Sequence, residues 1–276
     1  MAPYALEPLR IPRAMLSPDT EFSVGIVVAV REEMRAILKR GSPAVVESTD
    51  GMQIHRFRLS GMRVSLVKSG MGRERAERAG QRLIINDQSN IVLAAGFCAG
   101  LRESVIPGDL VISEFVTDLE ETDGSTKSAS SYQTPAGLIE PTLTTHARVF
   151  NGGILTASAI ARDSKAKLAL ANSFPNCLAL DMESSGVARA ASANGVPWIA
   201  VRAVTDGVQD DLPLDFARYS NANGEVSRSR IAAAVLARPW SIPSFLRLAG
   251  RSALAARNLA AFVEALVAAM PTVAPK

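Results

Sequence analysis

Two carboxylates on either side of one predicted strand have the residue types and placement that bond-cleaving chemistry requires. Glu183 ends the run Leu178-Ala-Leu-Asp-Met-Glu183, and Asp206 follows the apolar run from Trp198 to Val204. In open α/β sheets, ligand-binding groups lie at the carboxyl ends of the strands. Two carboxyls in one cleft can cleave a bond to the anomeric carbon of a sugar. Asp206 could equally cap the turn that follows it, so its position alone leaves both interpretations open.

The composition argues against several classes of protein. The 276 residues are 47% hydrophobic and 21% charged, as in an ordinary globular domain. A formal net charge of +3 is too small to indicate nucleic-acid binding. Cys98 and Cys177 have neither the spacing of a disulfide framework nor that of a metal site, and 2 histidines are too few for a histidine-rich site. We therefore expect no metal, no cofactor and no nucleic-acid partner, and a reducing, cytoplasmic location.

The amino-terminal segment is expected to be neither a signal peptide nor a membrane span. Residues 1–20 are interrupted by Pro3, Pro8, Pro12 and Pro18 and contain no continuous apolar run. No segment of the chain approaches the roughly 18 consecutive apolar residues of a transmembrane helix. We predict a loose extension over 1–22 and a single domain over 23–270, with an Arg-rich helical tail from about residue 227.

Alternating strand and helix patterns predict how the carboxylates are held. The β-branched run from Ser23 to Val30 indicates a strand buried on both faces, and residues 31–39 have a helical pattern. Further strands are expected at 52–59, 62–67, 91–95, 110–116, 154–158, 177–180 and 198–204, with another helix at 73–86. The pattern predicts an α/β fold with a mixed, mostly parallel central β-sheet flanked by helices. Residues 117–137 are rich in Ser, Thr, Asp and Gly and are expected to form a long loop, such as a lid.

Five sequence blocks occur in the order found in a known family. They are Gly25-Ile-Val-Val-Ala-Val-Arg-Glu-Glu33, Val67-Lys-Ser-Gly-Met-Gly72, Gly96-Phe-Cys-Ala-Gly100, Pro107-Gly-Asp-Leu-Val-Ile-Ser113, and Asp181-Met-Glu183 with Val201-Arg-Ala-Val-Thr-Asp206. Together they resemble the purine nucleoside phosphorylase and nucleosidase family, and most closely its methylthioadenosine/S-adenosylhomocysteine nucleosidase branch. The likeness covers roughly residues 23–116 and 150–210. It implies a nucleoside phosphorylase-like fold and activity on a purine nucleoside.

The resemblance implies a role for each matching position. Glu33 corresponds to the residue that activates the attacking water, Glu183 to the carboxylate that binds the ribose 2′- and 3′-hydroxyls, and Asp206 to the acid that protonates the purine at N7. Thr205 flanks this acid, and Met182 corresponds to the methionine that packs beneath the sugar. The loops that approach the sugar and any bound anion contain Gly70, Gly72, Gly96 and Gly100.

Cleaving an N-glycosidic bond makes a different demand on each of the three acids. Asp206 must hold a proton near neutral pH, so we predict that burial raises its pKa. Glu183 can hydrogen-bond both hydroxyls and place negative charge beneath the cationic ring, whereas Glu33 must be ionised to accept a proton from water. Without the resemblance, Glu33 would be interpreted first as an acid in the first turn of a helix, and Glu183 would be explained equally well by pairing with a helix amino terminus. Arg202 lies within an apolar strand and should pair with a carboxylate, because an unpaired buried charge is costly.

The residues near Glu33 favour water over phosphate as the acceptor. Phosphorylases of this family hold phosphate with arginines and a hydroxyl, but this chain has Ala94 and Phe97 at the corresponding positions. Glu33 would also repel a phosphate dianion, which needs cationic partners. Arg31 lies beside this loop and keeps phosphorolysis open as an alternative. Phe97, a candidate substrate contact, stands where nucleosidases normally have Ser, and Ile160 lies near where an aromatic would stack on the purine, so the substrate stays open.

The carboxyl-terminal segment is basic and amphipathic. Between Glu225 and Glu264 the chain has no acid but contains Arg228, Arg230, Arg238, Arg247, Arg251 and Arg257. An apolar stripe with helical spacing is formed by Phe245, Leu248, Ala255, Leu259, Phe262 and Leu266. We expect this helix to pack on the sheet with its arginines in solvent. A second interpretation is weak contact with a membrane surface of anionic lipid, with Trp240 as an interfacial anchor. The tail also looks like that of family members associated with hopanoid biosynthesis, which remove adenine from an adenosylated lipid.

The sequence therefore predicts an enzyme that hydrolyses the N-glycosidic bond of a 5′-substituted, adenosine-type purine nucleoside and releases the base. Three alternatives remain, namely phosphorolysis of a purine nucleoside, removal of adenine from an adenosylated hopanoid lipid, and a non-catalytic nucleoside-binding module. The resemblance also implies a homodimer. The sequence leaves the 5′ group and the base open.

Overall fold

The computed structural model describes residues 21–49, 51–122, 125–135, 138, 146–161, 163–214, 216–219, 221, 224 and 227–270. Apart from residues 21 and 22, the expected amino-terminal extension lies outside these residues. Phe22 has only 2% of its surface exposed, so the packed domain already includes the end of that segment.

Strands and helices alternate along most of the chain. The strands are β1 (Ser23–Val28), β2 (Val45–Thr49), β3 (Met52–Leu59), β4 (Met62–Lys68), β5 (Ile91–Gly100), β6 (Leu110–Thr122), β7 (Ser125–Gln133), β8 (Val149–Thr156), β9 (Cys177–Asp181) and β10 (Trp198–Asp206). The helices are α1 (Arg31–Leu38), α2 (Arg73–Ile85), α3 (Ser164–Ser173), α4 (Ser184–Ala193), α5 (Arg228–Leu236) and α6 (Ile242–Ala268), with short 3₁₀ helices η2 (Phe216–Tyr219) and η3 (Pro239–Ser241). Each strand and helix predicted from the sequence is present, and several strands are longer than expected.

The strands form one mixed sheet that partly closes on itself. Its centre is parallel, with β1 between β4 and β5, and with β5 pairing next to β10. Antiparallel pairings add β3 and β2 beyond β4 and join β10 to β6, β6 to β7 and β5 to β9. Since β6, β8 and β9 pair in parallel, the strands β5, β10, β6, β8 and β9 form a closed ring. The α/β fold with a mixed sheet is confirmed, but antiparallel pairings are as frequent as parallel ones in the described residues, so the expectation of a mostly parallel sheet was wrong.

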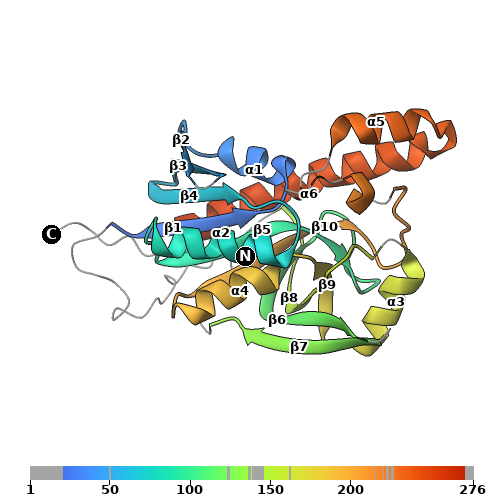
Figure 1. Ribbon diagram of the computed structural model, residues 1–276, viewed down its shortest axis with the longest axis horizontal. Coiled ribbons are helices and arrows are strands. Elements are labelled where there is room, and N and C mark those ends of the chain that lie inside the picture. The colour runs from blue at the N-terminus through green and yellow to red at the C-terminus, as the bar shows by residue number, and fades with distance from the viewer. Residues whose placement is uncertain are drawn as a thin grey trace, which may run out of the picture.

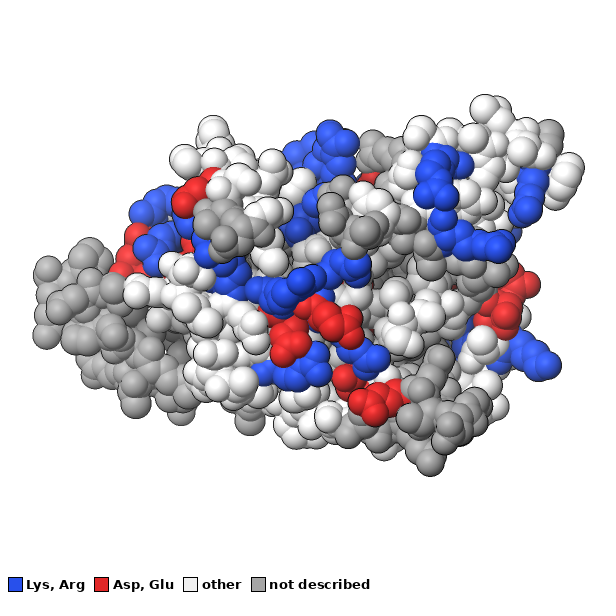
Figure 2. Space-filling model, in the orientation of Figure 1, with Lys and Arg blue, Asp and Glu red and all other residues white. Residues whose placement is uncertain are grey.

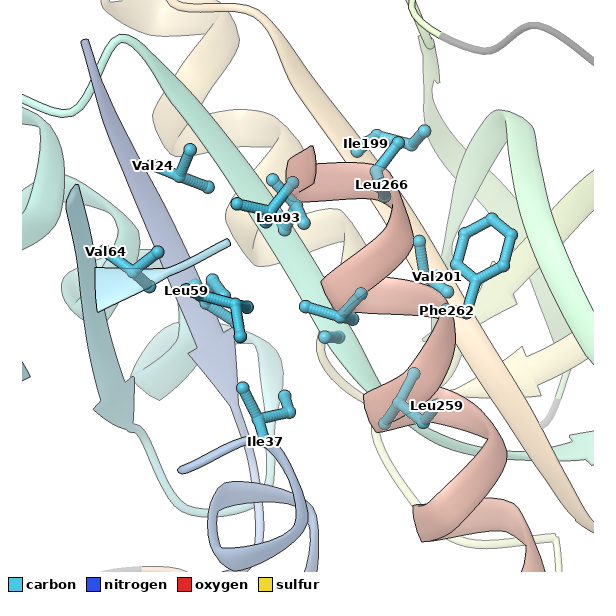
Figure 3. Packing of buried hydrophobic residues seen from close by; sticks show 14 of the residues in the cluster. Val24, Ile37, Leu59, Val64, Leu93, Ile199, Val201, Leu259, Phe262 and Leu266 are labelled. Atoms are coloured by element: carbon cyan, nitrogen blue, oxygen red, sulfur yellow. The ribbon is translucent and has the colours of Figure 1, made fainter. Parts of the chain in front are cut away.

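Helices cover both faces of the central strands (Figure 1). On one face, α1 and α6 pack against the sheet, and Ile37 of α1 and Phe262 of α6 belong to one buried cluster with Leu93 of β5 (Figure 3). On the other face, α2 and α4 pack against each other and against the sheet, where Val187 and Ala94 belong to a second buried cluster. Successive residues of a strand point to opposite faces, so strands covered on both sides need continuous apolar runs. This burial explains the apolar sequences of β1, β5 and β10.

The sequence predicted a hairpin after β3 and a long loop after residue 116, and the structure agrees with the first prediction alone. The hairpin between β3 and β4 is confirmed, and its turn residues Ser60 and Gly61 have φ values of 49° and 85°, as a two-residue hairpin loop requires. Residues 117–137 were expected to form a long loop, and this was wrong. β6 continues to residue 122 and pairs with β7, which spans 125–133. Ser- and Thr-rich segments have a strand preference that depends on their neighbours, and here the pairing decides.

The carboxyl-terminal helices divide into a packed part and a projecting part. The second half of α6 is buried against the sheet through residues such as Phe262, as the sequence pattern predicted. The first half of α6 projects from the domain together with α5, and we call residues 228–250 the helical hairpin (Figure 1). Leu236, Trp240 and Leu246 of this hairpin are 74%, 78% and 65% exposed. Within the described residues, no helix has both the length and the apolar character needed to cross a bilayer.

Candidate active site

Glu33 lies in the first turn of α1, directly after β1, and is only 1% exposed. Its Oε2 accepts hydrogen bonds from the amides of Ala29 at 2.8 Å and Val30 at 2.9 Å, and its Oε1 accepts one from Phe97 at 2.7 Å. Burial raises the pKa of Glu33, although these amides and Arg202 favour the ionised form. A raised pKa makes a carboxylate a better acceptor for a proton from water near neutral pH.

Glu183 is the N-cap residue of α4, just beyond the end of β9. Its Oε1 accepts a hydrogen bond from the amide of Gly72 at 3.0 Å, and its Oε2 lies 3.4 Å from Nη1 of Arg202. Gly72 has a φ of 109°, a conformation that favours glycine and directs this amide toward the carboxylate. Burial raises the pKa of Glu183 to about 7, against the lowering effect of Arg202. Near neutral pH this carboxyl is therefore divided between its ionised and protonated forms.

Arg202 of β10 connects the carboxylates of this region. Arg202 is 1% exposed, and its Nε lies 2.7 Å from Asp181 Oδ2 and 3.0 Å from Ser184 Oγ. Burial works against the charge of Arg202, but Asp181 and Glu183 raise its pKa. The expectation that Arg202 pairs with a carboxylate is therefore confirmed. We call Arg202 with Glu33, Asp181 and Glu183 the Arg202 cluster.

Gly96 leaves the space in which Arg202 and Glu33 approach each other. A Cβ at this position would lie 2.4 Å from Arg202 Nη1 and 3.0 Å from Glu33 Oε1. Gly96 is also the partner of Arg202 in the pairing of β5 with β10. Any larger residue would displace the guanidinium, which gives a physical reason for glycine here.

Asp206 ends β10 and is 5% exposed, and it has a partner that the sequence did not reveal. Lys167 of α3 is 0% exposed, and its Nζ lies 2.7 Å from Asp206 Oδ2 and 2.8 Å from the carbonyl oxygen of Gly207. The hydroxyl of Thr205 lies 2.8 Å from Asp206 Oδ1. Lys167 shares the buried face of its helix with Ala171 four residues later, a signal too weak to detect in one sequence. We call these two residues the Lys167–Asp206 pair.

Arg202 and Asp206, one residue from each group, both lie on β10 beside β5. In the pairing of β5 with β10, Arg202 is opposite Gly96 and Asp206 is opposite Ala99, with an irregularity just before Asp206. Such bulges redirect side chains and are frequent next to active sites. Cys98 lies between Gly96 and Ala99 on β5, opposite Val204, and burial raises the pKa of its thiol. The structure thus joins Glu33 to Glu183 through one cation and brings Asp206 to the same edge of the sheet, while their roles stay predictions.

The remaining candidate residues border these acids. Gly70 has a φ of 80° in the loop after β4, and Thr205 is 9% exposed. Met182 and Phe97 are half-buried, the first between two acids of the Arg202 cluster and the second next to Gly96. In the described part of the chain, no group of three or more His, Cys, Asp or Glu side chains could hold a metal ion.

A pocket reaches Asp206 from the side of α6. It is lined by Asp206, Gln209, Asp210, Asp211, Leu212, Pro213, Ser244, Arg247, Leu248 and Arg251. Glu33 and Glu183 do not line this pocket, so it belongs to the Asp206 side of the candidate site. Its wall combines acids, arginines and apolar side chains.

Comparison with known proteins identifies the family. The profile of the phosphorylase superfamily matches residues 23–237. A 5′-methylthioadenosine/S-adenosylhomocysteine nucleosidase of Shewanella loihica is 25% identical over 209 residues, which are 71% of this chain and 91% of that protein. All five sequence blocks fall within the matched residues.

Two solved structures show the same fold. A 5′-methylthioadenosine/S-adenosylhomocysteine nucleosidase from Neisseria meningitidis, in complex with methylthio-immucillin-A, has a TM-score of 0.68 at 20% identity and covers 90% of this chain and 99% of its own. Futalosine hydrolase of Helicobacter pylori has a TM-score of 0.68 at 18% identity and covers 89% of this chain and 97% of its own. At these identities the similarity to solved structures establishes the fold alone, and the match to the family profile establishes membership of the family. This chain belongs to the phosphorylase superfamily.

Proposed function

We propose that this protein hydrolyses the N-glycosidic bond of a 5′-substituted, adenosine-type nucleoside and releases the base. The observation that carries the proposal is that Arg202, which is bonded to the Asp181 side of the Arg202 cluster, and Asp206, which is bonded to Lys167, lie near the same end of β10. Cleavage of this bond needs negative charge beside the ribose and a proton beside the departing base. The names of the nucleosidase relatives and of futalosine hydrolase support the same class of reaction here.

Glu33 and Glu183 would act on the ribose side. Glu33 Oε1 accepts a hydrogen bond from the Phe97 amide, and an oxygen with two lone pairs can accept a second one from an attacking water. The water oxygen would bond to C1′ while its proton passes to Glu33. Glu183, in its ionised form, would accept hydrogen bonds from the ribose hydroxyls and stabilise the positive charge that develops on the ring.

Asp206 would act on the base side. As the bond between C1′ and N9 breaks, its electron pair enters the purine, and a proton on N7 neutralises the departing base. The Asp206 carboxyl is buried and hydrogen-bonded on both oxygens, so it is held in one orientation before the reaction. Gly70, Gly96, Phe97, Met182 and Thr205 are proposed as substrate contacts because they border the three acids.

The carboxylate partners of Arg202 favour water over phosphate as the acceptor. The guanidinium of Arg202, beside Gly96, is already bonded to Asp181 and lies next to Glu183. Ala94 is buried in β5 and brings no charge to this edge. A phosphate dianion near Gly96 would therefore meet the carboxylates of the Arg202 cluster, which disfavours phosphorolysis.

Base release from a panel of 5′-substituted adenosines, with and without phosphate, tests the proposal. We expect adenine release at a rate independent of phosphate, with free ribose derivatives and no ribose 1-phosphate as products. The matching inosines, which keep the sugar and change the base, serve as controls for base specificity. An absolute phosphate requirement would establish the phosphorylase alternative. Binding without turnover across the panel would establish a nucleoside-binding module.

We also propose that the protein is a homodimer, in line with the resemblance noted from the sequence, and that it is cytoplasmic, in line with its two unpaired cysteines. Light scattering after size-exclusion chromatography measures the mass directly. A mass twice that of the 29.2 kDa chain is expected, and a mass equal to one chain would contradict the dimer.

Removal of adenine from an adenosylated hopanoid lipid is a second candidate, and the helical hairpin favours it. Its exposed Leu236, Trp240 and Leu246 are accompanied by the exposed Arg238 and Arg247. Lys and Arg side chains gather over this part of the molecule in Figure 2. Apolar side chains flanked by arginines suit weak binding to an anionic membrane surface, where a lipid-linked nucleoside would be found.

Co-sedimentation with lipid vesicles tests this membrane contact. We expect binding to anionic vesicles at low salt, no binding to neutral ones, and reduced binding for Trp240→Ser. Lys165→Ser, an exposed change far from the hairpin in sequence, is the matched control. Equal recovery of wild type and Trp240→Ser on anionic vesicles would remove the support for the lipid substrate.

A further inference from the structure

Lys167 is a fully buried cation that the proposed roles of the three acids leave unexplained. It is 0% exposed on α3, whose inward face it shares with Ala171. Burying an ammonium group is expensive unless its partners compensate, and an apolar side chain of similar size is often equally or more stable there. Its partners are the carboxylate of Asp206 at 2.7 Å and the carbonyl of Gly207 at 2.8 Å. The direct bond to the proposed acid points to a role in the reaction.

We propose that Lys167 is a positioning residue that holds, at rest, the proton that Asp206 delivers to the departing base, an inference that rests on the hydrolysis proposed above. The resting pair holds one proton, on Nζ of Lys167. As the bond to C1′ breaks and its electron pair enters the base, Asp206 takes this proton and passes it to the purine, which leaves a neutral amine. The attacking water loses its proton to Glu33. After product release, Glu33 returns a proton to solvent and Lys167 takes one up, so the cycle balances.

The hydroxyl of Thr205 allows Asp206 to exist in both protonation states. Thr205 Oγ1 lies 2.8 Å from Asp206 Oδ1 and 3.2 Å from the carbonyl oxygen of Cys98. When Asp206 is ionised, this hydroxyl can donate to Oδ1. When Oδ2 carries the proton received from Nζ of Lys167, Oδ1 remains an acceptor and the hydroxyl can keep donating to it or donate to Cys98 instead. The surroundings therefore suit either state without movement of the heavy atoms, as a proton relay requires.

Other charged groups fix the position of the pair from the loop after β10. Asp210 and Asp211 both act electrostatically on Lys167. Asp211 accepts a hydrogen bond from the amide of Ser164 at 2.7 Å and so anchors the start of α3. Asp210 pairs with Arg251 of α6 at 2.8 Å, which balances its charge. These acids hold the loop and the helix, whereas Asp206 is bonded to Nζ itself.

Two substrates distinguish proton delivery from a structural role. An adenosine-type nucleoside needs a proton on its departing base, whereas a 4-nitrophenyl riboside releases a stable phenolate without one. For Lys167→Met we expect kcat on the nucleoside to fall about 100-fold or more, the usual contribution of a placed general acid. Hydrolysis of the nitrophenyl riboside should be unchanged. Lys165→Met, on the exposed side of the same helix, should leave both rates unchanged.

The pH dependence is a second readout, which a packing defect would not move. In the wild type, nucleoside hydrolysis should persist until the pair loses its proton at alkaline pH. In Lys167→Met, Asp206 must hold the proton alone, so the alkaline limb of kcat should move to lower pH. Lys167→Arg keeps the positive charge, but a guanidinium does not release its proton, so this variant should not restore the nucleoside rate.

Three results would overturn the role of Lys167: equal losses on both substrates, an unshifted alkaline limb, or full activity of Lys167→Arg. If the variants do not fold, the wild type alone decides. An alkaline limb for the nucleoside that is absent for the nitrophenyl riboside supports the relay, and identical profiles overturn it. A wild type that releases no base from any nucleoside overturns the proposed function instead, so the two failures are distinguishable.

Discussion

The two groups of buried charges at the candidate site are balanced differently. In the Arg202 cluster, one guanidinium faces three carboxylates, those of Glu33, Asp181 and Glu183. In the Lys167–Asp206 pair, one ammonium faces one carboxylate. The cluster can carry surplus negative charge, while the pair is neutral and holds a proton that can move. The proposed reaction separates charge in the same sense, because the ribose becomes positive and the departing base negative.

This difference predicts that acid pH disables the Arg202 cluster. Burial raises the pKa of Glu33, and it raises the pKa of Glu183 to about 7. The Arg202 cluster therefore loses its surplus negative charge as the pH falls. A fall in kcat toward acid pH is expected, with this acid limb set by the cluster, and kcat measured across the pH range checks it.

The largest expected effect comes from Asp206→Asn, which removes the acid and leaves Lys167 without its counter-charge. We expect kcat on the nucleoside to fall about 1,000-fold, within the usual range for a general acid. Breaking a buried ion pair should also lower the free energy of unfolding by about 3 kcal/mol. Adenine release and urea denaturation measure the two effects. Adding Lys167→Met should restore stability but not activity, and a double variant with wild-type kcat would contradict the assignment.

Glu183→Gln is the corresponding change in the Arg202 cluster. It removes negative charge beneath the proposed ribosyl cation, so we expect kcat to fall about 100-fold, as for the loss of one electrostatic stabiliser. Unlike changes at the pair, this loss should be equal for the nucleoside and the nitrophenyl riboside, because both form the same cation. A loss confined to the nucleoside would mean that Glu183 acts on the departing base. The Arg202 cluster and the Lys167–Asp206 pair would then not have different roles.

The same variant should change how stability depends on pH. The pKa of Glu183 in the folded protein, about 7, lies above its ordinary value of 4.5, so its contribution is fully present below pH 4.5 and is lost as the pH rises through 7. Glutamine does not titrate, so Glu183→Gln should be more stable than the wild type at pH 8, by up to about 3 kcal/mol. The two proteins should differ least near pH 4.5. Thermal unfolding at both pH values measures the difference in stability. Identical unfolding curves of the two proteins at pH 8 would show that ionising the buried Glu183 does not destabilise the fold.

Gly96→Ala tests the close approach that holds the Arg202 cluster together. The added Cβ would lie 2.4 Å from Arg202 Nη1, so the guanidinium must move away from its carboxylates. We expect a loss of about 1–3 kcal/mol in the free energy of unfolding, as for other overpacked sites, with lower activity on both substrates. Gly250 of α6 has open space around it, and Gly250→Ala should instead stabilise the helix by about 0.5–1 kcal/mol. Equal effects of the two changes would contradict the crowding at Gly96.

The sequence predicted the Arg202 cluster more completely than the Lys167–Asp206 pair, for a physical reason. A charged residue such as Arg202 within a buried apolar run must have a counter-charge, so its pairing can be inferred from one segment. Lys167 lies on α3, where the neighbouring Leu168 is 41% exposed and the lysine is buried. A prediction from apolar periodicity would bury Leu168 and expose Lys167. The partner that overrides it is 39 residues away along the chain, beyond the reach of any local pattern.

The same limit explains the parts of the fold that were missed. The strands β1, β5 and β10 are buried on both faces, and their continuous apolar runs mark them in the sequence. β7 consists largely of Ser, Thr and Lys and becomes a strand through its pairing with β6. Such a pairing depends on the neighbouring strand, which composition does not reveal.

Arg251→Met is expected to have the smallest effect. It tests whether the Arg251–Asp210 ion pair takes part in proton delivery by the Lys167–Asp206 pair. Arg251 and Asp210 are 2.8 Å apart, and their side chains are 31% and 33% exposed. Burial opposes ionisation of Asp210, but the Gly207 amide and Arg251 lower its pKa. The pair therefore contributes stability above the ordinary value near 3.8, and this contribution is lost as the pH falls through the lower folded-state value.

Partly exposed ion pairs contribute about 0.2–1 kcal/mol, so Arg251→Met should lose less than about 1 kcal/mol at neutral pH and nothing in strong acid. Denaturation at several pH values measures this loss. We expect kcat on the nucleoside to change little, because Arg251 is bonded to Asp210 and not to Asp206, although both line the same pocket. If kcat fell as far as in Lys167→Met, the proton would be held by a network that includes Asp210 and Arg251. An unchanged kcat would confine proton delivery to Nζ of Lys167 and the carboxyl that it touches.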